Sequence, residues 1–123
     1  MSLEKTNELV SMLLRGRTVA HMAHWATDSY SQHQALGAFY EGLGELLDRF
    51  VESYQGYADK RVAPTLDAAN PKESPVAELE LDMDRLARLR YQVVPQDETC
   101  LQNILDEIES LYQTTLYKLR MLK

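Results

Sequence analysis

Two histidines and an acidic pair are the residues of this chain whose types and spacing could bind a metal ion. His24 and His33 lie on either side of a short polar stretch, and Asp48 and Glu52 follow, four residues apart. Imidazole nitrogens and carboxylate oxygens together suit Fe(II), Mn(II) or Zn(II), and the residue types alone do not choose among these metals. These four residues are therefore the candidate metal ligands.

The positions of the two histidines predict that they face one another. The stretch from Thr27 to Ser31 is rich in short polar side chains that cap helix ends, so a tight corner between two helices is expected there. His24 and His33 are equally distant from the middle of that corner, and such residues lie opposite each other in an antiparallel helix pair. The imidazoles can therefore share one site. The alternative is that they only finish the corner, hydrogen-bonded to backbone carbonyls.

The acidic pair cannot reach that site within the same chain. Asp48 follows His33 by 15 residues, which corresponds to roughly 22 Å along a helix, whereas metal–ligand bonds measure about 2.0–2.2 Å. A site made of all four residues thus needs a second copy of the chain, and a two-fold axis would give two equivalent sites per homodimer. The alternative is that Asp48 and Glu52 belong to an ordinary solvated helix face.

The elements that must position these residues are all helical, and they form a single domain over residues 1–123. Apolar residues recur at helical spacing in four segments. The predicted helices cover about 3–26, 31–55, 75–93 and 97–122. No strand pattern stands out, so the predicted fold class is all-α.

The connection 57–74 contains prolines and is too long for a hairpin loop, so it predicts a crossover between the second and third helices. One long crossover at this place is the arrangement of a ferritin-like four-helix bundle. Ser2 and Ser74-Pro75 are expected at helix starts, and Gly56 is expected to cap the end of the second helix. Gly37 and Gly44 lie seven residues apart, on one face, where another backbone could approach closely.

Composition favours a cytoplasmic protein without a membrane span. The chain has 13 basic and 19 acidic residues, a formal net charge of −6 and one cysteine, Cys100. An acidic surface repels nucleic acid, so nucleic-acid binding is not expected. A lone cysteine forms no disulfide within the chain and fits a reducing cytosol.

Two further groups are interpreted as structural rather than functional. Trp25 and Tyr40 are expected to pack in the core. The arginines of the third helix stand beside several acidic residues, so they indicate salt bridges rather than a nucleic-acid surface. These arginines are Arg85, Arg88 and Arg90.

Residues 19–55 carry a recognisable set of residues, which are His24-Trp25, His33, Leu36, Phe39, Leu43, Leu47-Asp48 and Glu52. With this set the stretch resembles the Dps-type mini-ferritins, which oxidise and store iron. The resemblance implies that His24 and His33 hold iron from one chain while Asp48 and Glu52 hold it from the other, across an interface of the first two helices. The whole chain is also similar to short phage-encoded ferritin-like proteins of uncharacterised function, on its D-E-T-C-L-Q-N-I-L-D-E-I and T-L-Y-K-L stretches.

The chain departs from the mini-ferritins at Gly37, where that family has an acidic ligand one turn after the second histidine. This departure predicts one ion per site rather than two. The first hypothesis is a ferritin-like metal-binding homodimer, open to higher assembly, that would act as a ferroxidase if the ion is iron. The second hypothesis is a non-enzymatic helical-bundle protein that has lost the dinuclear centre and binds a host or viral protein.

Overall fold

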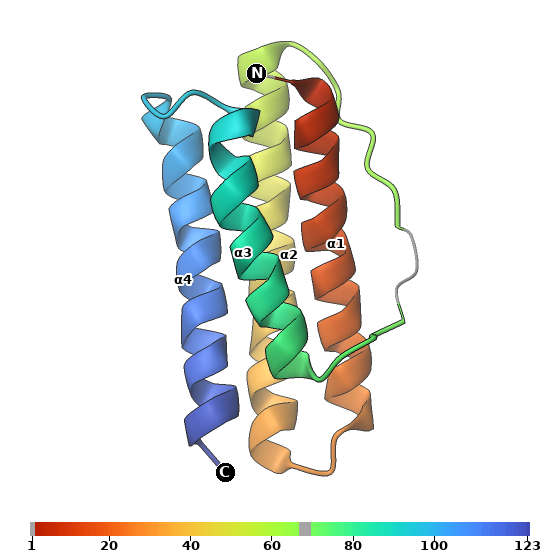
Figure 1. Cartoon of the computed structure of the whole chain (residues 1–123). Coiled ribbons are helices and arrows are strands. Elements are labelled where there is room, and N and C mark those ends of the chain that lie inside the picture. The colour runs from red at the N-terminus through yellow and green to blue at the C-terminus, as the bar shows by residue number, and fades with distance from the viewer. Residues whose placement is uncertain (1, 67–69) are drawn as a thin grey trace.

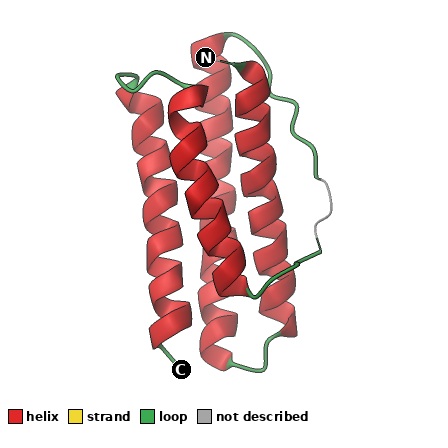
Figure 2. Ribbon diagram, viewed as in Figure 1, coloured by secondary structure: helices red, strands yellow, loops and turns green. Residues whose placement is uncertain are grey.

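The structure is a computed structural model that describes residues 2–66 and 70–123. It contains the helices α1 (Leu3–Ala26), α2 (Tyr30–Ala58), α3 (Pro75–Val93) and α4 (Thr99–Met121), shown in Figure 1. The described residues outside these helices are turns and loops, with no strand among them (Figure 2). The predicted all-α class and the order of four helices are confirmed.

Three helix starts follow local capping chemistry, as predicted for the first and third helices, and the second helix begins at Tyr30 rather than 31. Ser2, Ser29 and Ser74 are the N-caps of α1, α2 and α3, and each accepts a hydrogen bond from a backbone N–H in the first turn. Pro75 follows at the first helical position, where its missing N–H has no helical partner to lose. Helix α4 differs, because its N-cap Glu98 makes no such side-chain bond.

Two helix ends differ from the predictions. Helix α2 runs past Gly56 to Ala58, and its C-cap is Asp59 in the left-handed region with φ of 54°. The extra turn is held because Gln55 accepts the Asp59 N–H at its carbonyl and the Val62 N–H at its side chain. The fourth helix begins at Thr99 rather than 97, because the preceding residues fold into a turn closed by the Glu98 N–H on the Pro95 carbonyl.

Each helix packs against two neighbours: α1 contacts α2 and α3, and α4 contacts α2 and α3. Helices α1 and α4 run in one direction and α2 and α3 in the other, so all neighbours are antiparallel (Figure 1). The connection between α2 and α3 returns along the outside of α1. A long crossover is therefore present where the sequence predicts it, although residues 67–69 of that prediction lie outside the described residues. Kinship with ferritin-like proteins stays a prediction.

The four helices share one apolar core. Its largest fully buried side chains include Phe39, Phe50 and Tyr112, and the ring of Phe39 meets the ring of Tyr112 edge-on at 4.9 Å. In the part of the chain that the structure describes, none of the helices has a stretch long and apolar enough to span a lipid bilayer.

Candidate functional site

His24 and His33 meet at the corner between α1 and α2, as their spacing predicts. Their rings stack with centroids 3.7 Å apart and an angle of 16° between the planes. The Nδ1 of His24 donates to the His33 carbonyl at 2.6 Å, and the Nδ1 of His33 donates to the His24 carbonyl at 2.8 Å. Since a carbonyl oxygen only accepts, both protons sit on Nδ1, and Nε2 is the acceptor of each neutral ring. We call this pair the histidine clasp.

Gly37 provides the space that the clasp needs. A Cβ at position 37 would lie 3.0 Å from Cε1 and 3.2 Å from Nδ1 of His24. The imidazole of His24 therefore lies against the α2 backbone at Gly37. The glycine is explained by the packing of this ring, and a carboxylate there would displace it.

The clasp as it stands does not fit one shared ion. The lone pair of an imidazole nitrogen lies in the ring plane, so two ligands of one ion need planes that intersect at the metal. The planes of His24 and His33 are nearly parallel, and their lone pairs do not converge. At least one ring would have to turn out of the stack and give up its bond to the carbonyl.

Asp48 and Glu52 lie away from the clasp within the chain, as predicted. Helix α2 is continuous from Tyr30 to Ala58, so the rise of an α-helix places Asp48 roughly 22 Å from His33. Both carboxylates are exposed. Within residues 2–66 and 70–123, no three or more His, Cys, Asp or Glu side chains gather as a metal site. A site completed by a second chain stays a prediction.

Aromatic side chains surround the clasp on the outer surface. His21 stacks on Tyr40 with ring centroids 3.9 Å apart and lies 4.2 Å from Trp25, while Tyr30 approaches His33 at 6.5 Å. Trp25 is 68% exposed and Tyr30 is 74% exposed. The prediction that Trp25 packs in the core is wrong, because the buried positions of α1 end at Val19 and Ala20.

We call His21, Trp25, Tyr30 and Tyr40 the aromatic corner. Farther along the groove between α1 and α2 lies the acidic stripe, which consists of Glu41, Glu45, Asp48 and Glu52, all exposed on α2. The stripe borders a shallow hollow that Leu14 and Arg17 of α1 also line.

Arg17 lies across α2 between the aromatic corner and the acidic stripe. Its Nε donates to the Tyr40 carbonyl at 3.1 Å, and a Cβ at Gly44 would lie 2.7 Å from that nitrogen. Gly37 and Gly44 therefore admit the side chains of His24 and Arg17, not the second backbone that their spacing suggested.

Two carboxylates of α3, one turn apart, have pKa values that are shifted in opposite directions. Glu78 is buried and pairs with Arg15 at 2.7 Å. The hydrogen bond from Arg15 lowers the pKa of Glu78, and the backbone N–H of Lys72 adds to that effect. Asp82 is also buried, and burial raises its pKa from 3.8 to about 6 even though the Tyr112 hydroxyl donates to it at 2.8 Å. Sequence reasoning missed both residues.

A signal for Asp82 was present in the sequence. It stands three residues after Leu79 and four before Leu86, both of which are buried. That spacing places the carboxylate on the apolar stripe of its helix, where an acid is unusual. Its position among apolar residues, rather than a motif, could have identified it.

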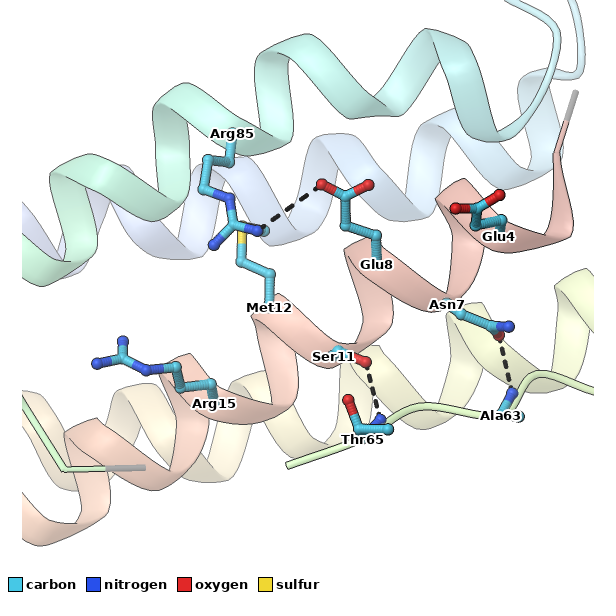
Figure 3. A pocket seen from close by; sticks show the side chains of 9 residues that line it. All are labelled: Glu4, Asn7, Glu8, Ser11, Met12, Arg15, Ala63, Thr65 and Arg85. Atoms are coloured by element: carbon cyan, nitrogen blue, oxygen red, sulfur yellow. Dashed lines mark hydrogen bonds and ion pairs between the residues drawn. The ribbon is translucent and has the colours of Figure 1, made fainter. Parts of the chain in front are cut away.

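The crossover is fastened along α1 by polar side chains one helical turn apart (Figure 3). Asn7 accepts the Ala63 N–H at 2.8 Å, and Ser11 accepts the Thr65 N–H at 2.9 Å. Arg15 continues this row and donates to the Asn70 carbonyl at 3.1 Å. An open hollow beside the row is bordered by Glu8 and by Arg85 of α3. These bonds hold Ala63, Thr65 and Asn70 of the crossover against α1.

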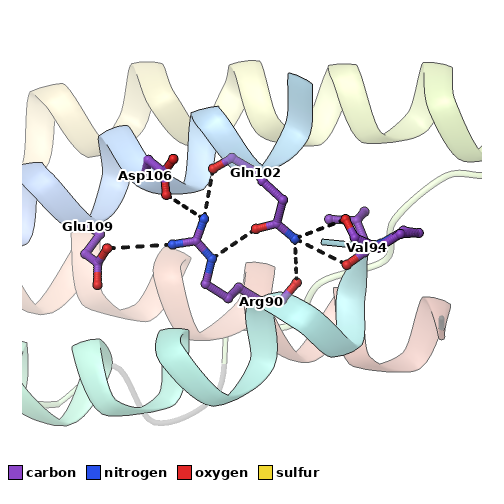
Figure 4. A network of polar contacts seen from close by, with 6 residues as sticks. Arg90, Val94, Gln102, Asp106 and Glu109 are labelled. Carbon is purple, nitrogen blue, oxygen red and sulfur yellow. Dashed lines mark hydrogen bonds and ion pairs between the residues drawn. The ribbon is translucent and has the colours of Figure 1, made fainter. Parts of the chain in front are cut away.

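A second polar network joins α3 to α4 (Figure 4). The guanidinium of Arg90 donates to the Gln102 side chain at 3.0 Å, to the Gln102 carbonyl at 2.9 Å and to Asp106 at 2.7 Å. Gln102 donates in return to the carbonyls of Arg90, Val94 and Pro95. The predicted salt bridging of the third-helix arginines holds for Arg85 and Arg90, but their acidic partners lie on α1 and α4 rather than on α3.

Comparison with known proteins identifies relatives of unknown activity. Residues 24–119 match the model of a family described as "Family of unknown function (DUF5856)". The chain is 24% identical, over 117 residues, to "Uncharacterized 14.6 kDa protein in mobD-ri intergenic region" of Enterobacteria phage T4, with 95% of this chain and 89% of that protein covered. No solved structure matches. Because the family model spans most of the chain, from the histidine clasp to the end of α4, this protein belongs to the family of unknown function DUF5856.

Proposed function

We propose that the protein acts by binding proteins rather than by catalysis, and that its first partner is a second copy of itself. The carrying observation is the exposure of Trp25 and Tyr30 beside the histidine clasp. Tryptophan and tyrosine are enriched among the few residues that dominate binding energy at protein interfaces, and burial in the core does not account for these two side chains. The related protein of phage T4 supports a phage-encoded protein as the setting.

The two ends of the α1–α2 face differ in chemistry. Its aromatic corner carries His21 beside the clasp, and its other end carries the acidic stripe. A two-fold axis across α2 would place each end against the opposite end of the second protomer, as an isologous interface requires. The imidazole of His21, whose ring N–H can donate a hydrogen bond, would then face carboxylates, which only accept.

A single two-fold axis relates the residue positions along α2 to one another. The midpoint between His33 and Asp48 falls between Tyr40 and Glu41, and the midpoint between Gly37 and Gly44 falls at the same place. An antiparallel pairing of α2 about this point sets the clasp of one protomer opposite Asp48 of its mate. The side chains of His24 and Arg17 occupy the space over the two glycines, close to the α2 backbone.

The test is the molar mass of the protein in solution, measured by light scattering across micromolar concentrations at low salt. The wild type is expected to be a dimer. Trp25→Ala and Asp48→Lys should each shift it towards the monomer. Asp84→Lys should not, because Asp84 is an exposed acid in the groove between α3 and α4, outside the α1–α2 face. A monomeric wild type, or equal effects of Asp48→Lys and Asp84→Lys, would overturn the proposal.

A metal site between the protomers is the second candidate function. It is favoured by the protonation pattern of the clasp, which leaves the Nε2 atoms of both histidines unprotonated in the neutral rings, but one ring has to turn out of the stack before both Nε2 atoms can reach the same ion. In this candidate His24 and His33 of one protomer and Asp48 and Glu52 of the other would hold iron or another divalent transition metal. Iron would bring Fe(II) oxidation as the chemistry of such a site.

Metal titration separates this candidate from the first. Calorimetric titration of the dimer with Fe(II) under anaerobic conditions, and with Zn(II), should show one ion per site, and Glu52→Ala should weaken uptake by about tenfold or more. Asp84→Ala, which removes an exposed carboxylate from α3 instead, is the matched control. A wild-type dimer that takes up neither ion would eliminate the metal site and leave the interaction function intact.

A further inference from the structure

Asp82 is a buried carboxylate at the meeting point of three helices. It belongs to α3 and is 5% exposed. From α4, the hydroxyl of the fully buried Tyr112 donates to its Oδ2 at 2.8 Å. From α1, Gly16 presents its bare backbone to the same atoms. No role in the α1–α2 face requires this arrangement.

Gly16 is the residue that admits the pair into the core. A Cβ at this position would overlap the Asp82 carboxylate and would lie 2.8 Å from the Tyr112 hydroxyl. Any larger side chain would therefore push α1 away from α3 and α4 or expel the carboxylate. The three helices are built around an acid that the bundle keeps from water.

Within the described ranges 2–66 and 70–123, no basic side chain forms a direct ion pair with Asp82. Arg15, one residue from Gly16 on α1, directs its guanidinium to Glu78 at 2.7 Å. Arg85, on the same helix as Asp82, lies nearest to Glu8 at 3.9 Å. Glu78 adds a negative charge from the preceding turn, and Tyr112 of α4 supplies one hydrogen bond. Among the described residues, the carboxylate of Asp82 therefore accepts one hydrogen bond, from the hydroxyl of Tyr112.

We propose that Asp82 is an internal proton switch that sets how firmly α3 is held between α1 and α4. With its proton, Asp82 is a neutral acid beside Tyr112, and the three-helix contact is tight. Without the proton, a buried charge remains in the core, and opening of α3 becomes easier because opening hydrates the carboxylate. This inference is independent of the proposed dimer.

The direction of the pH effect follows from the shift in pKa. Burial raises the folded pKa of Asp82 to about 6, against 3.8 for the ordinary group, so between these values the folded protein binds more protons than the unfolded chain. The stabilising contribution is therefore complete below about pH 4, declines as the pH rises towards 6, and is lost above that.

The test compares the melting temperature of Asp82→Asn with that of the wild type from about pH 4.5 to about pH 8, because asparagine keeps the shape and removes the charge. At pH 7.5 the variant is expected to melt about 5–10 °C higher, and the gap should close by pH 4.5. Asp84→Asn, an exposed acid on the same helix, is the matched control and should follow the wild type. A gap that does not change with pH would overturn the switch.

A second measurement holds even if the asparagine variant folds poorly. The side-chain carboxyl carbon of Asp82 in the intact wild-type protein should titrate in its NMR spectrum with a pKa of about 6, above the ordinary value of 3.8. Amide exchange in α3, corrected for intrinsic rates, should quicken by about tenfold or more between pH 5 and pH 7.5. Titration of Asp82 near pH 4, or α3 exchange that is unchanged over that range, would refute the proposal.

Discussion

The two tight connections of the bundle solve one structural problem with different chemistry. Between α1 and α2, His24 and His33 each donate to the other's backbone carbonyl. Between α3 and α4, Arg90 and Gln102 each donate to the other's carbonyl and to further acceptors. Both pairs hold two antiparallel helix ends by crossed side-chain-to-backbone bonds.

The difference lies in charge and burial. The Arg90 side chain is 7% exposed and donates to the buried Gln102 as well as to the exposed Asp106. The histidine rings, by contrast, are only half-buried. Bonds to the opposite backbone carbonyls are therefore enough to account for a pair of histidines at a helix corner. A residue type associated with metals is thus weak evidence for a metal until its geometry is known.

The largest expected effect is at the buried pair of Arg90 and Gln102. Arg90→Ala leaves the Gln102 side chain and carbonyl without their charged donor in a buried site, and should lower the free energy of unfolding by about 3 kcal/mol. Urea denaturation measures this change. Arg88→Ala, two residues away and exposed, should change it by less than about 0.5 kcal/mol. Comparable losses in the two variants would show that the buried contacts of Arg90 add nothing to stability beyond what an exposed arginine adds.

The long connection extends the comparison, because Glu78 holds it through the N–H groups of Lys72 and Glu73 and through Arg15. Glu78→Gln should lower the free energy of unfolding by about 2 kcal/mol at pH 7. The folded pKa of Glu78 lies below its ordinary 4.5, so its contribution is complete above that pH. It is lost as the pH falls through the folded pKa.

Urea denaturation of the Glu78→Gln variant at pH 7 and at pH 3 checks both statements. The difference from the wild type should shrink at the lower pH. Glu80→Gln breaks a surface pair with Arg120 and should cost less than about 1 kcal/mol at pH 7. A pH-independent loss at Glu78 would mean that the charge of this carboxylate does not hold the crossover.

The parts of the fold that depend on local chemistry could be predicted from the sequence. Ser2, Ser29 and Ser74 cap helices through bonds to residues three positions away, and Pro75 fixes its own backbone angle. The end of α2 at Asp59 and the start of α4 at Thr99 were missed. The first depends on a side-chain bond beyond the helix, and the second depends on the turn from Pro95 to Glu98. Gln55 extends α2 by reaching forward to Val62, and no propensity encodes that bond.

The candidate site was predictable in position but not in orientation. Symmetry about the corner placed His24 opposite His33, because helix geometry alone decides which residues are opposed. The stacking of the rings and the use of Gly37 as their floor depend on side-chain torsions, which sequence spacing does not fix. Trp25 was misplaced for a related reason, since an apolar residue at the end of a helix can lie beyond the core.

The smallest expected effect is at the histidine clasp, whose rings are half-buried. His24→Ala and His33→Ala should each lower the free energy of unfolding by about 1 kcal/mol, because each removes one bond to a carbonyl and the ring stack. The double variant should cost less than the sum of the two, since either ring alone loses its stacking partner. His21→Ala, whose ring packs on Tyr40 instead, is the control and should be additive with His33→Ala. Full additivity of His24 and His33 would show that the corner does not depend on the pair, and would return these histidines to the search for a ligand.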